Sequence, residues 1–156
     1  MIEKGNIAPI FEAKTNEGGS FNLKDYLGQW IILYFYPKDD TSGCTKEACD
    51  FRDNMERLTV TSTKVFGVSP DNIDSHNKFV DKYDLNFTLI ADPNKEICNL
   101  YGVIGEKKMF GKSYLGLIRT TYIISPDGKI AYSWQNVKVN GHVEAVILKL
   151  NELTKK

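Results

Sequence analysis

Two cysteines, Cys44 and Cys49, stand five positions apart just after an apolar run that ends at Pro37. The run 31–36 has the length of a buried strand, and the polar turn 38–43 leads into a helical stretch that Cys44 opens. Unpaired amides and the positive end of the dipole at a helix N-terminus stabilise a thiolate. This arrangement predicts a nucleophilic cysteine at position 44, although a buried cysteine is more often a small core residue.

Ionisation of the thiol is only part of the chemistry that this stretch can support. A free thiol with a pKa near 8.5 is about 3% thiolate at pH 7, so complete ionisation raises its reactivity only about thirtyfold. A fast reaction also needs groups that stabilise charge developing on the bond being broken. Thr41 can offer a hydroxyl to a substrate oxygen, and Gly43 and Cys44 can offer backbone amides at close approach. We expect Pro37 to bend the chain out of the sheet and to shield this pocket from water.

Two charged residues extend the candidate site. Arg119 stands just before the apolar segment 120–124 and is the best candidate for a distant cation, although a lone arginine is more often a surface charge. Glu47 lies one turn after Cys44 and could pair with Arg119, but an exposed helix glutamate is an equally good interpretation. Thr41 could also be a helix N-cap, and we expect it both to cap the helix and to bind substrate.

The spacing of the two cysteines limits what they can do together. Residues five apart in a regular helix have Cα atoms about 8.7 Å apart, beyond the ~7 Å limit for a disulfide. If Cys44 and Cys49 form a bond, the first turns of the helix must therefore unwind. The alternative is that Cys49 merely packs against the sheet. Cys98 lies among apolar neighbours in a short helical segment and is interpreted as a core residue.

Strand-like and helical segments alternate around these residues. The expected elements are a hairpin with strands around Phe11 and Phe21, strands at 31–36, 64–69, 87–91, 120–125 and 129–134, and helices at 44–58, 73–83, 92–101 and 143–153. Asp71 or Asp74 would cap the second helix, and the last helix would bury Val143, Val146, Ile147, Leu150 and Leu153 on one face. This order predicts one α/β domain over residues 1–156, with a largely parallel sheet and an antiparallel edge at 120–134.

Composition excludes several classes of function. Twenty basic and twenty acidic residues cancel, so no net field would attract nucleic acid or an anionic membrane. No apolar run approaches the ~20 residues that span a bilayer, and residues 1–6 lack the apolar core of a signal peptide, so we expect a cytoplasmic protein. Three cysteines argue against a disulfide framework there. His76 and His142 lack ligand spacing, so we expect no zinc or other metal.

The residues Pro37, Thr41 and Cys44 resemble the peroxidatic motif of the peroxiredoxins, most closely that of the bacterioferritin comigratory protein (PrxQ) subfamily. The resemblance extends along most of the chain, through segments 86–89, 101–103, 109–112 and 119–124. Together with the alternation of elements, it implies a thioredoxin-like three-layer sandwich with a mixed central sheet and an N-terminal β-hairpin. It also implies that Arg119 is the active-site arginine and that Cys49 is a resolving cysteine.

This resemblance implies a thiol-dependent peroxidase that reduces hydrogen peroxide and organic hydroperoxides. The thiolate of Cys44 would become a sulfenic acid, and Cys49 would then condense with it to form an intramolecular disulfide. A thioredoxin-like dithiol donor would reopen the disulfide. The resemblance further implies no cofactor, and a monomer as in many members of the subfamily.

Two other classes of function remain open from the residues. A thioredoxin-like disulfide oxidoreductase usually carries Cys-x-x-Cys, whereas four residues separate Cys44 and Cys49. A redox-switched binding protein would instead expose a partner surface when the helix opens. Rapid catalytic consumption of peroxide would favour the enzyme, and an apolar patch exposed by oxidation would favour the binding protein.

Overall fold

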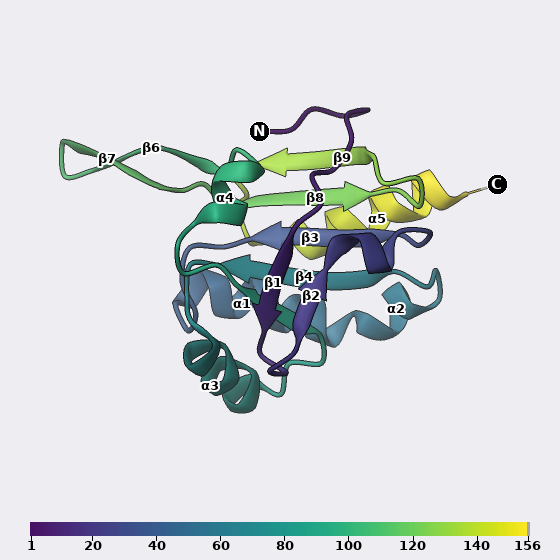
Figure 1. Cartoon of the computed structure of the whole chain (residues 1–156), viewed down its shortest axis with the longest axis horizontal. Coiled ribbons are helices and arrows are strands. Elements are labelled where there is room, and N and C mark those ends of the chain that lie inside the picture. The colour runs from purple at the N-terminus through teal and green to yellow at the C-terminus, as the bar shows by residue number, and fades with distance from the viewer. Residues whose placement is uncertain (156) are drawn as a thin grey trace.

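The structure is a computed structural model that describes residues 1–155. An interior strand of its main sheet, Ile31–Phe35 (β3), has all five residues buried because the sheet is covered on both faces. The other strands of this sheet are Glu12–Thr15 (β1), Ser20–Asn22 (β2), Lys64–Ser69 (β4), Thr88–Ala91 (β5), Thr120–Ile124 (β8) and Ile130–Gln135 (β9). Their order across the seven-stranded sheet is β2-β1-β5-β4-β3-β8-β9 (Figure 1).

The sheet is mixed, as expected, but it is not largely parallel. Only β3, β4 and β5 run parallel to one another. The pairs β1–β2, β1–β5, β3–β8 and β8–β9 are antiparallel. The N-terminal hairpin and the hairpin at Pro126, Asp127 and Gly128 are both confirmed, and together they supply most of the antiparallel pairing.

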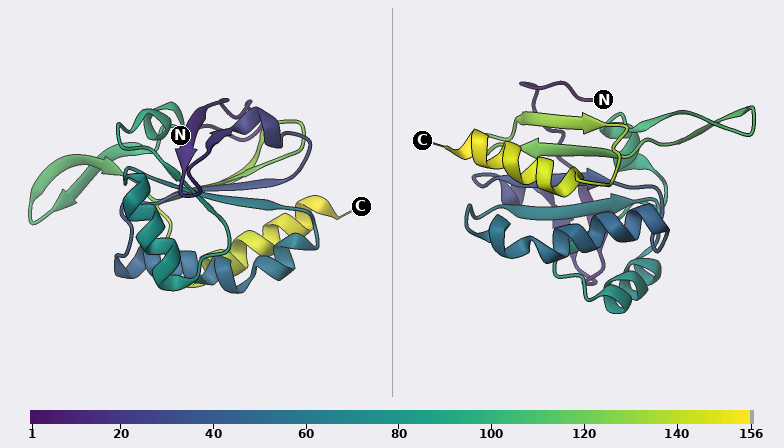
Figure 2. Two further views of the ribbon diagram at one scale, coloured as in Figure 1. Left: turned by 60° about the horizontal axis from the view of Figure 1, so that its bottom comes forward. Right: turned by 180° about the vertical axis from the view of Figure 1, so that it is seen from behind.

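Helices and loops cover the two faces of the sheet, which gives three layers. The helices are Ser42–Asp53 (α1), Met55–Thr59 (α2), Ile73–Tyr83 (α3), Glu96–Leu100 (α4) and His142–Thr154 (α5), with a 3-10 turn at Leu23–Tyr26 (η1). Figure 2 shows α1, α2, α3 and α5 on one side, and α4 with the N-terminal segment on the other. Alternate side chains of β3 enter the two cores: Ile31, Leu33 and Phe35 face α4, and Ile32 and Tyr34 face α1.

Three details of the helices differ from the sequence-based expectation. The helix expected at 44–58 is broken at Asn54, whose side-chain amide donates to the Asp50 carbonyl at 2.7 Å and competes with the regular backbone pattern. Asn72, and neither Asp71 nor Asp74, caps α3 by accepting a hydrogen bond from the backbone amide of Ser75 at 2.9 Å. Leu153 is only partly buried near the end of α5.

A second, two-stranded sheet formed by Ile104–Met109 (β6) and Lys112–Leu117 (β7) was not expected from the sequence. It projects from the body as a long hairpin, visible at the left of Figure 1. Most of its residues are exposed or only partly buried, so they show none of the apolar alternation that marks a half-buried strand. Its turn places Phe110 and Gly111 at φ 52° and φ 77°, and a phenylalanine is an unusual residue for such a turn.

Candidate active site

Cys44 lies in the first turn of α1, directly after the loop that leaves β3. Its side chain faces the core beside Tyr34 and Ala48, and the residue is 1% exposed. The first helical hydrogen bond of α1 runs from the amide of Thr45 to the carbonyl of Thr41 at 2.8 Å. The amides that precede Thr45 in this turn therefore have no intrahelical acceptor, and they surround Cys44 with donors.

Arg119 reaches Cys44 from the opposite strand. In the register of β3 and β8, Phe35 pairs with Thr120, so the residue before Thr120 lies where the chain turns out of β3. From there Arg119 donates from Nη2 to the Sγ of Cys44 at 3.3 Å and from Nη1 to the Oε1 of Glu47 at 2.7 Å. One guanidinium therefore holds the thiol and the carboxylate together. The alternative of a surface arginine and an exposed glutamate is wrong, since Glu47 is fully buried and the Arg119 side chain is only 15% exposed.

Gly43 is the residue that makes this close approach possible. A Cβ at this position would stand 3.2 Å from the Nη2 of Arg119, so any other residue would press on the guanidinium. Gly43 also lines an open pocket of about 500 Å³ with Ser42, Lys46, Lys138, Val139 and Asn140. A neighbouring pocket of about 290 Å³ includes Pro37 and Arg119. The expected pocket residues Pro37 and Gly43 thus both lie near Arg119.

Thr41 occupies the N-cap position of α1, but its side chain does not cap the helix as expected. The hydroxyl instead donates to the carbonyl of Lys38 at 3.0 Å, which tightens the loop before the helix. The residue is exposed, so its hydroxyl oxygen stays accessible beside the first turn of α1. The hydroxyl of Thr41 therefore stabilises a turn instead of capping α1, and its role in binding substrate stays a prediction.

Burial sets the electrostatics of the site. Desolvation raises the pKa of Glu47 from 4.5 to about 7, against the opposing charge and hydrogen bond of Arg119. Desolvation lowers the pKa of Arg119, but Glu47 and Cys44 more than compensate and leave it above its usual value. Both oxygens of Glu47 are buried, and Oε2 accepts no hydrogen bond from any residue in the described range 1–155.

His142, at the start of α5, is a neighbour that sequence reasoning missed. Its Nε2 lies 3.9 Å from the Oε2 of Glu47 and 2.8 Å from the Oγ1 of Thr121. Burial, and secondly the charge of Arg119, lower the pKa of His142 to about 4, so the ring is neutral near pH 7 and makes no ion pair with Glu47. No local pattern could have found this contact, because it joins α1, β8 and α5.

The other two cysteines lie in different surroundings. Cys49 is on the same helix as Cys44 and partly buried, and burial raises the pKa of its thiol above the usual value. Cys98 is fully buried in α4, as expected for a core residue. Burial and then a hydrogen bond with Asp92 raise the pKa of Cys98. Cys44, Cys49 and Cys98 are all free thiols in this structure.

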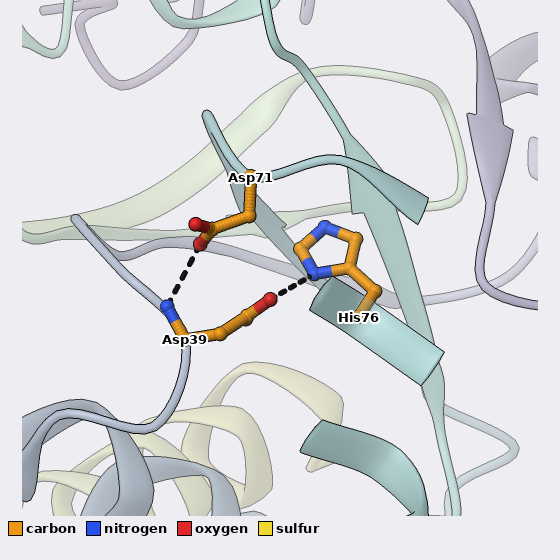
Figure 3. A group of neighbouring side chains, drawn as sticks. All are labelled: Asp39, Asp71 and His76. Carbon is orange, nitrogen blue, oxygen red and sulfur yellow. Dashed lines mark hydrogen bonds and ion pairs between the residues drawn. The ribbon is translucent and has the colours of Figure 1, made fainter. Parts of the chain in front are cut away.

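A second polar cluster lies beside the loop that precedes Cys44. Asp39, Asp71 and His76 bring ligand-type atoms within 4.8 Å of one another, the kind of grouping that a cation could use (Figure 3). However, His76 Nε2 lies 2.9 Å from the carbonyl of Ile90, which can only accept, so this nitrogen carries a proton. The other ring nitrogen, Nδ1, lies 2.7 Å from the Oδ2 of Asp39.

The remaining hydrogen bonds of this cluster involve Asp39 and its neighbours. Asp39 accepts from the hydroxyls of Tyr36 at 2.6 Å and Ser75 at 2.8 Å, and its own amide donates to Asp71 at 2.7 Å. These contacts engage both carboxylate oxygens of Asp39 and both ring nitrogens of His76 in hydrogen bonds with protein groups. The cluster fits a buried hydrogen-bonded network, and we assign no metal to it.

A buried cysteine in the first turn of a helix, bonded to an arginine that a buried glutamate holds, is an arrangement that suits a cysteine-dependent redox enzyme. Comparisons with known proteins agree. Residues 4–133 match the model of the AhpC/TSA family. Peroxiredoxin Bcp of Bacillus subtilis is 42% identical over 155 residues, 99% of each chain, and peroxiredoxin Bcp of Escherichia coli is 40% identical over 151 residues, 97% of each chain.

A solved structure extends this similarity to the fold. The bacterioferritin comigratory protein of Xanthomonas campestris, studied for its alkyl peroxide reduction activity, superposes with a TM-score of 0.89 at 36% identity, over 93% of this chain and 92% of that one. The chain therefore belongs to the AhpC/TSA family and is a peroxiredoxin of the bacterioferritin comigratory protein (PrxQ) subfamily. The expected thioredoxin-like sandwich is confirmed, and the protein is a thiol-dependent peroxidase that draws on a thiol reductant.

Proposed function

We propose that Cys44 is the cysteine that peroxide oxidises. The observation that carries this proposal is the 3.3 Å hydrogen bond from the Nη2 of Arg119 to the Sγ of Cys44. A fixed guanidinium favours the thiolate over the thiol, and the free amides of the first helical turn add to this effect. Among residues 1–155, neither Cys49 nor Cys98 receives a hydrogen bond from a guanidinium, and both thiols have raised pKa values.

In the first step, the thiolate of Cys44 attacks the nearer peroxide oxygen and the O–O bond breaks. The sulfur becomes a sulfenic acid, and the departing oxygen leaves as hydroxide or alkoxide, which takes a proton to become water or an alcohol. Arg119, Thr41 and the amides of Gly43 and Cys44 bind the two oxygens and stabilise the charge on the leaving one. Pro37 limits the access of water, and Glu47 holds the guanidinium in place.

In the second step, we propose that the thiol of Cys49 attacks the sulfenic sulfur of Cys44. A disulfide forms and water leaves. Both residues belong to the continuous helix α1, in which Cα atoms five apart stand about 8.7 Å from each other, so this step requires the first turns of α1 to unwind. The reactive and resolving steps therefore use two different conformations of the same segment.

We propose that a thioredoxin-like dithiol donor then reduces the disulfide by thiol–disulfide exchange, and that hydrogen peroxide and organic hydroperoxides are both substrates. The chemistry requires no cofactor. The cytoplasm, which keeps such donors reduced, is the compartment that suits this cycle. No helix among residues 1–155 is long and apolar enough to cross a membrane. The balanced charge of the chain argues against nucleic acid or an anionic membrane as a partner, and the resemblance to the subfamily supports a monomer.

Mass spectrometry of the wild-type protein after one equivalent of peroxide, with and without reduced thioredoxin, tests this cycle. We expect a Cys44–Cys49 disulfide without thioredoxin and its disappearance with thioredoxin. Oxidation that falls mainly on Cys98, or that leaves Cys44 unmodified, would refute the assignment. A disulfide that forms slowly and that thioredoxin does not reopen would favour the redox-switched binding protein.

A further inference from the structure

The loop before Cys44 is tied to helix α3 by its two acidic residues. Asp39 is bound by the hydroxyl of Ser75 and the ring of His76, both in the first turns of α3. Asp40 is bound by Lys82 Nζ at 2.8 Å and by the hydroxyl of Tyr83 at 2.6 Å, both in the last turn. Opposite ends of α3 therefore hold consecutive residues of the loop.

The contacts of Asp39 are the buried part of this attachment. The side chains of Asp39 and His76 are 4% and 0% exposed, so water cannot replace the bonds between them (Figure 3). His76 is fixed at its other nitrogen by the carbonyl of Ile90 in β5. The ring of His76 thus connects the loop to the parallel strands of the sheet, because one ring nitrogen bonds Asp39 and the other bonds Ile90.

The backbone of the loop has a conformation that needs such support. Asp40 adopts φ 58°, a left-handed conformation that a residue with a side chain occupies at some cost. The bonds from Lys82 and Tyr83 hold Asp40 there, and the bonds to the Asp39 side chain hold the residue before it. Thr41 follows directly, and Cys44 lies three residues beyond it. The orientation of Thr41 and of the first turn of α1 therefore depends on where Asp39 and Asp40 are held.

We propose that His76 and Asp39 are positioning residues for the peroxide step: the buried 2.7 Å contact between them holds the loop 37–41 in the arrangement that orders Thr41 and the helical first turn around Cys44. This proposal rests on the proposed function, since it assumes that Cys44 reacts in the helical conformation and is resolved in the unwound one. Neither residue touches the substrate. They act through the loop, and they favour the conformation that reacts with peroxide over the one that forms the disulfide.

Weakening the contact between Asp39 and His76 should therefore change the rate of Cys44 oxidation and the rate of disulfide formation in opposite directions. Oxidation of Cys44 slows because Thr41 and the helix amides are less well ordered when peroxide arrives. Disulfide formation accelerates because the segment 40–49 unwinds more readily once its upstream attachment is loose. A faster second step also leaves less time for a second peroxide to oxidise the sulfenic acid to the sulfinic acid. A general loss of structure would slow both steps, so the opposite signs identify a positioning role.

Three variants of the full-length protein test the proposal. His76→Gln cannot donate from both ends of the side chain to Asp39 and Ile90 at once, so it breaks the attachment. Ser75→Ala removes one hydroxyl donor to Asp39 and keeps the backbone amide that Asn72 caps, so it is a milder change. Lys78→Gln removes a positive charge from the exposed face of the same helix and is the matched control.

Rapid acid quenching followed by thiol alkylation and mass spectrometry gives both rate constants for each variant. For His76→Gln we expect oxidation by hydrogen peroxide to slow at least about threefold and disulfide formation to accelerate up to about tenfold, with less sulfinic acid at high peroxide. Ser75→Ala should show smaller changes of the same signs, and it decides the question alone if His76→Gln does not fold. Lys78→Gln should match the wild type.

Unchanged rates in both test variants, or a fall in both rates together, would overturn the positioning role. If wild-type Cys44 is not oxidised at all, the proposed function fails and the comparison of variants does not arise. If the wild type cycles normally while the variants behave like Lys78→Gln, only the positioning role of Asp39 and His76 is refuted.

Discussion

Arg119 donates one hydrogen bond to Cys44 at 3.3 Å although the two residues come from opposite halves of the chain. The antiparallel register of β3 and β8 brings them together, because Phe35 and Thr120 are paired: Arg119 directly precedes Thr120, and a short loop leads from Phe35 to the helix that carries Cys44. The second hydrogen bond of the guanidinium, to Glu47, fixes its orientation. The site is thus built across two strands and one helix, and its geometry depends on the planar fork of an arginine.

The first prediction follows from that fork. Arg119→Lys keeps the charge but cannot bond Cys44 and Glu47 together in the same plane, so the thiolate loses an oriented donor. We expect kcat/KM for hydrogen peroxide to fall by about 10²-fold, the loss that follows removal of one preorganised donor. Steady-state kinetics with thioredoxin measure it. Arg57→Lys makes the same substitution at an exposed ion pair with Glu144 and should leave kcat/KM unchanged. Near-wild-type activity of Arg119→Lys would contradict the role of the fork.

Glu47 and His142 lead to the second prediction, which concerns stability. The folded protein keeps a proton on Glu47 between about pH 4.5 and 7 that the unfolded chain has lost, so this group makes stability fall as pH rises. His142 has the opposite sign, since between about pH 4 and 6.5 the unfolded chain binds a proton that the folded protein excludes. In the wild type the two effects largely cancel where the windows overlap.

Glu47→Gln should remove the cancellation and expose the effect of His142. Relative to the wild type, the free energy of unfolding of this variant should rise with pH by about 1.4 kcal/mol per pH unit between about pH 4.5 and 6.5. Urea unfolding at a series of pH values measures this difference. Glu56→Gln, on the exposed side of α2, is the matched control and should run parallel to the wild type. A Glu47→Gln curve that also runs parallel would show that Glu47 is not protonated by burial.

The local part of the site was predictable from the sequence because it is continuous in the chain. A buried strand, a polar turn and a helix follow one another between residues 31 and 53, and Cys44 must then lie at the helix start. Arg119 was found only as a candidate, since its pairing depends on how two distant strands align. His142 and the contact of Asp39 with His76 were missed because burial and tertiary packing, which no local pattern records, turn ordinary polar residues into partners.

The same distinction applies to the fold. The order of strands and helices followed from apolar periodicity, whereas the amount of antiparallel pairing depended on which strands became neighbours. The β6–β7 hairpin escaped prediction because few of its residues are buried, so no alternating pattern is selected along it. The break at Asn54 depends on one side-chain hydrogen bond to the Asp50 carbonyl.

The third prediction separates the roles of the three cysteines. Cys44→Ser should abolish peroxide reduction and leave the fold intact, because the nucleophile is lost from a helix that keeps its other contacts. Cys49→Ser should react once with peroxide and then fail to turn over with thioredoxin. Cys98→Ser, at a buried thiol in the core on the other face of the sheet from Cys44, should turn over normally and is the matched control. Normal turnover of Cys49→Ser would mean that Cys98 or an external thiol resolves the sulfenic acid.

The fourth prediction concerns α1, the helix that carries Cys44 and Cys49. Cys44 needs the first turn of α1 folded, since Arg119 and the helix amides meet its sulfur there, whereas a bond to Cys49 needs the same turn unwound. Stoichiometric oxidation should therefore reduce the helical signal in far-UV circular dichroism by the equivalent of about one to two turns, and thioredoxin should restore it. Cys49→Ser, oxidised to the sulfenic acid, should keep the full signal because nothing draws the helix open. An unchanged spectrum in a sample that mass spectrometry shows to be disulfide-bonded would mean that the two sulfurs meet by a route other than unwinding of α1.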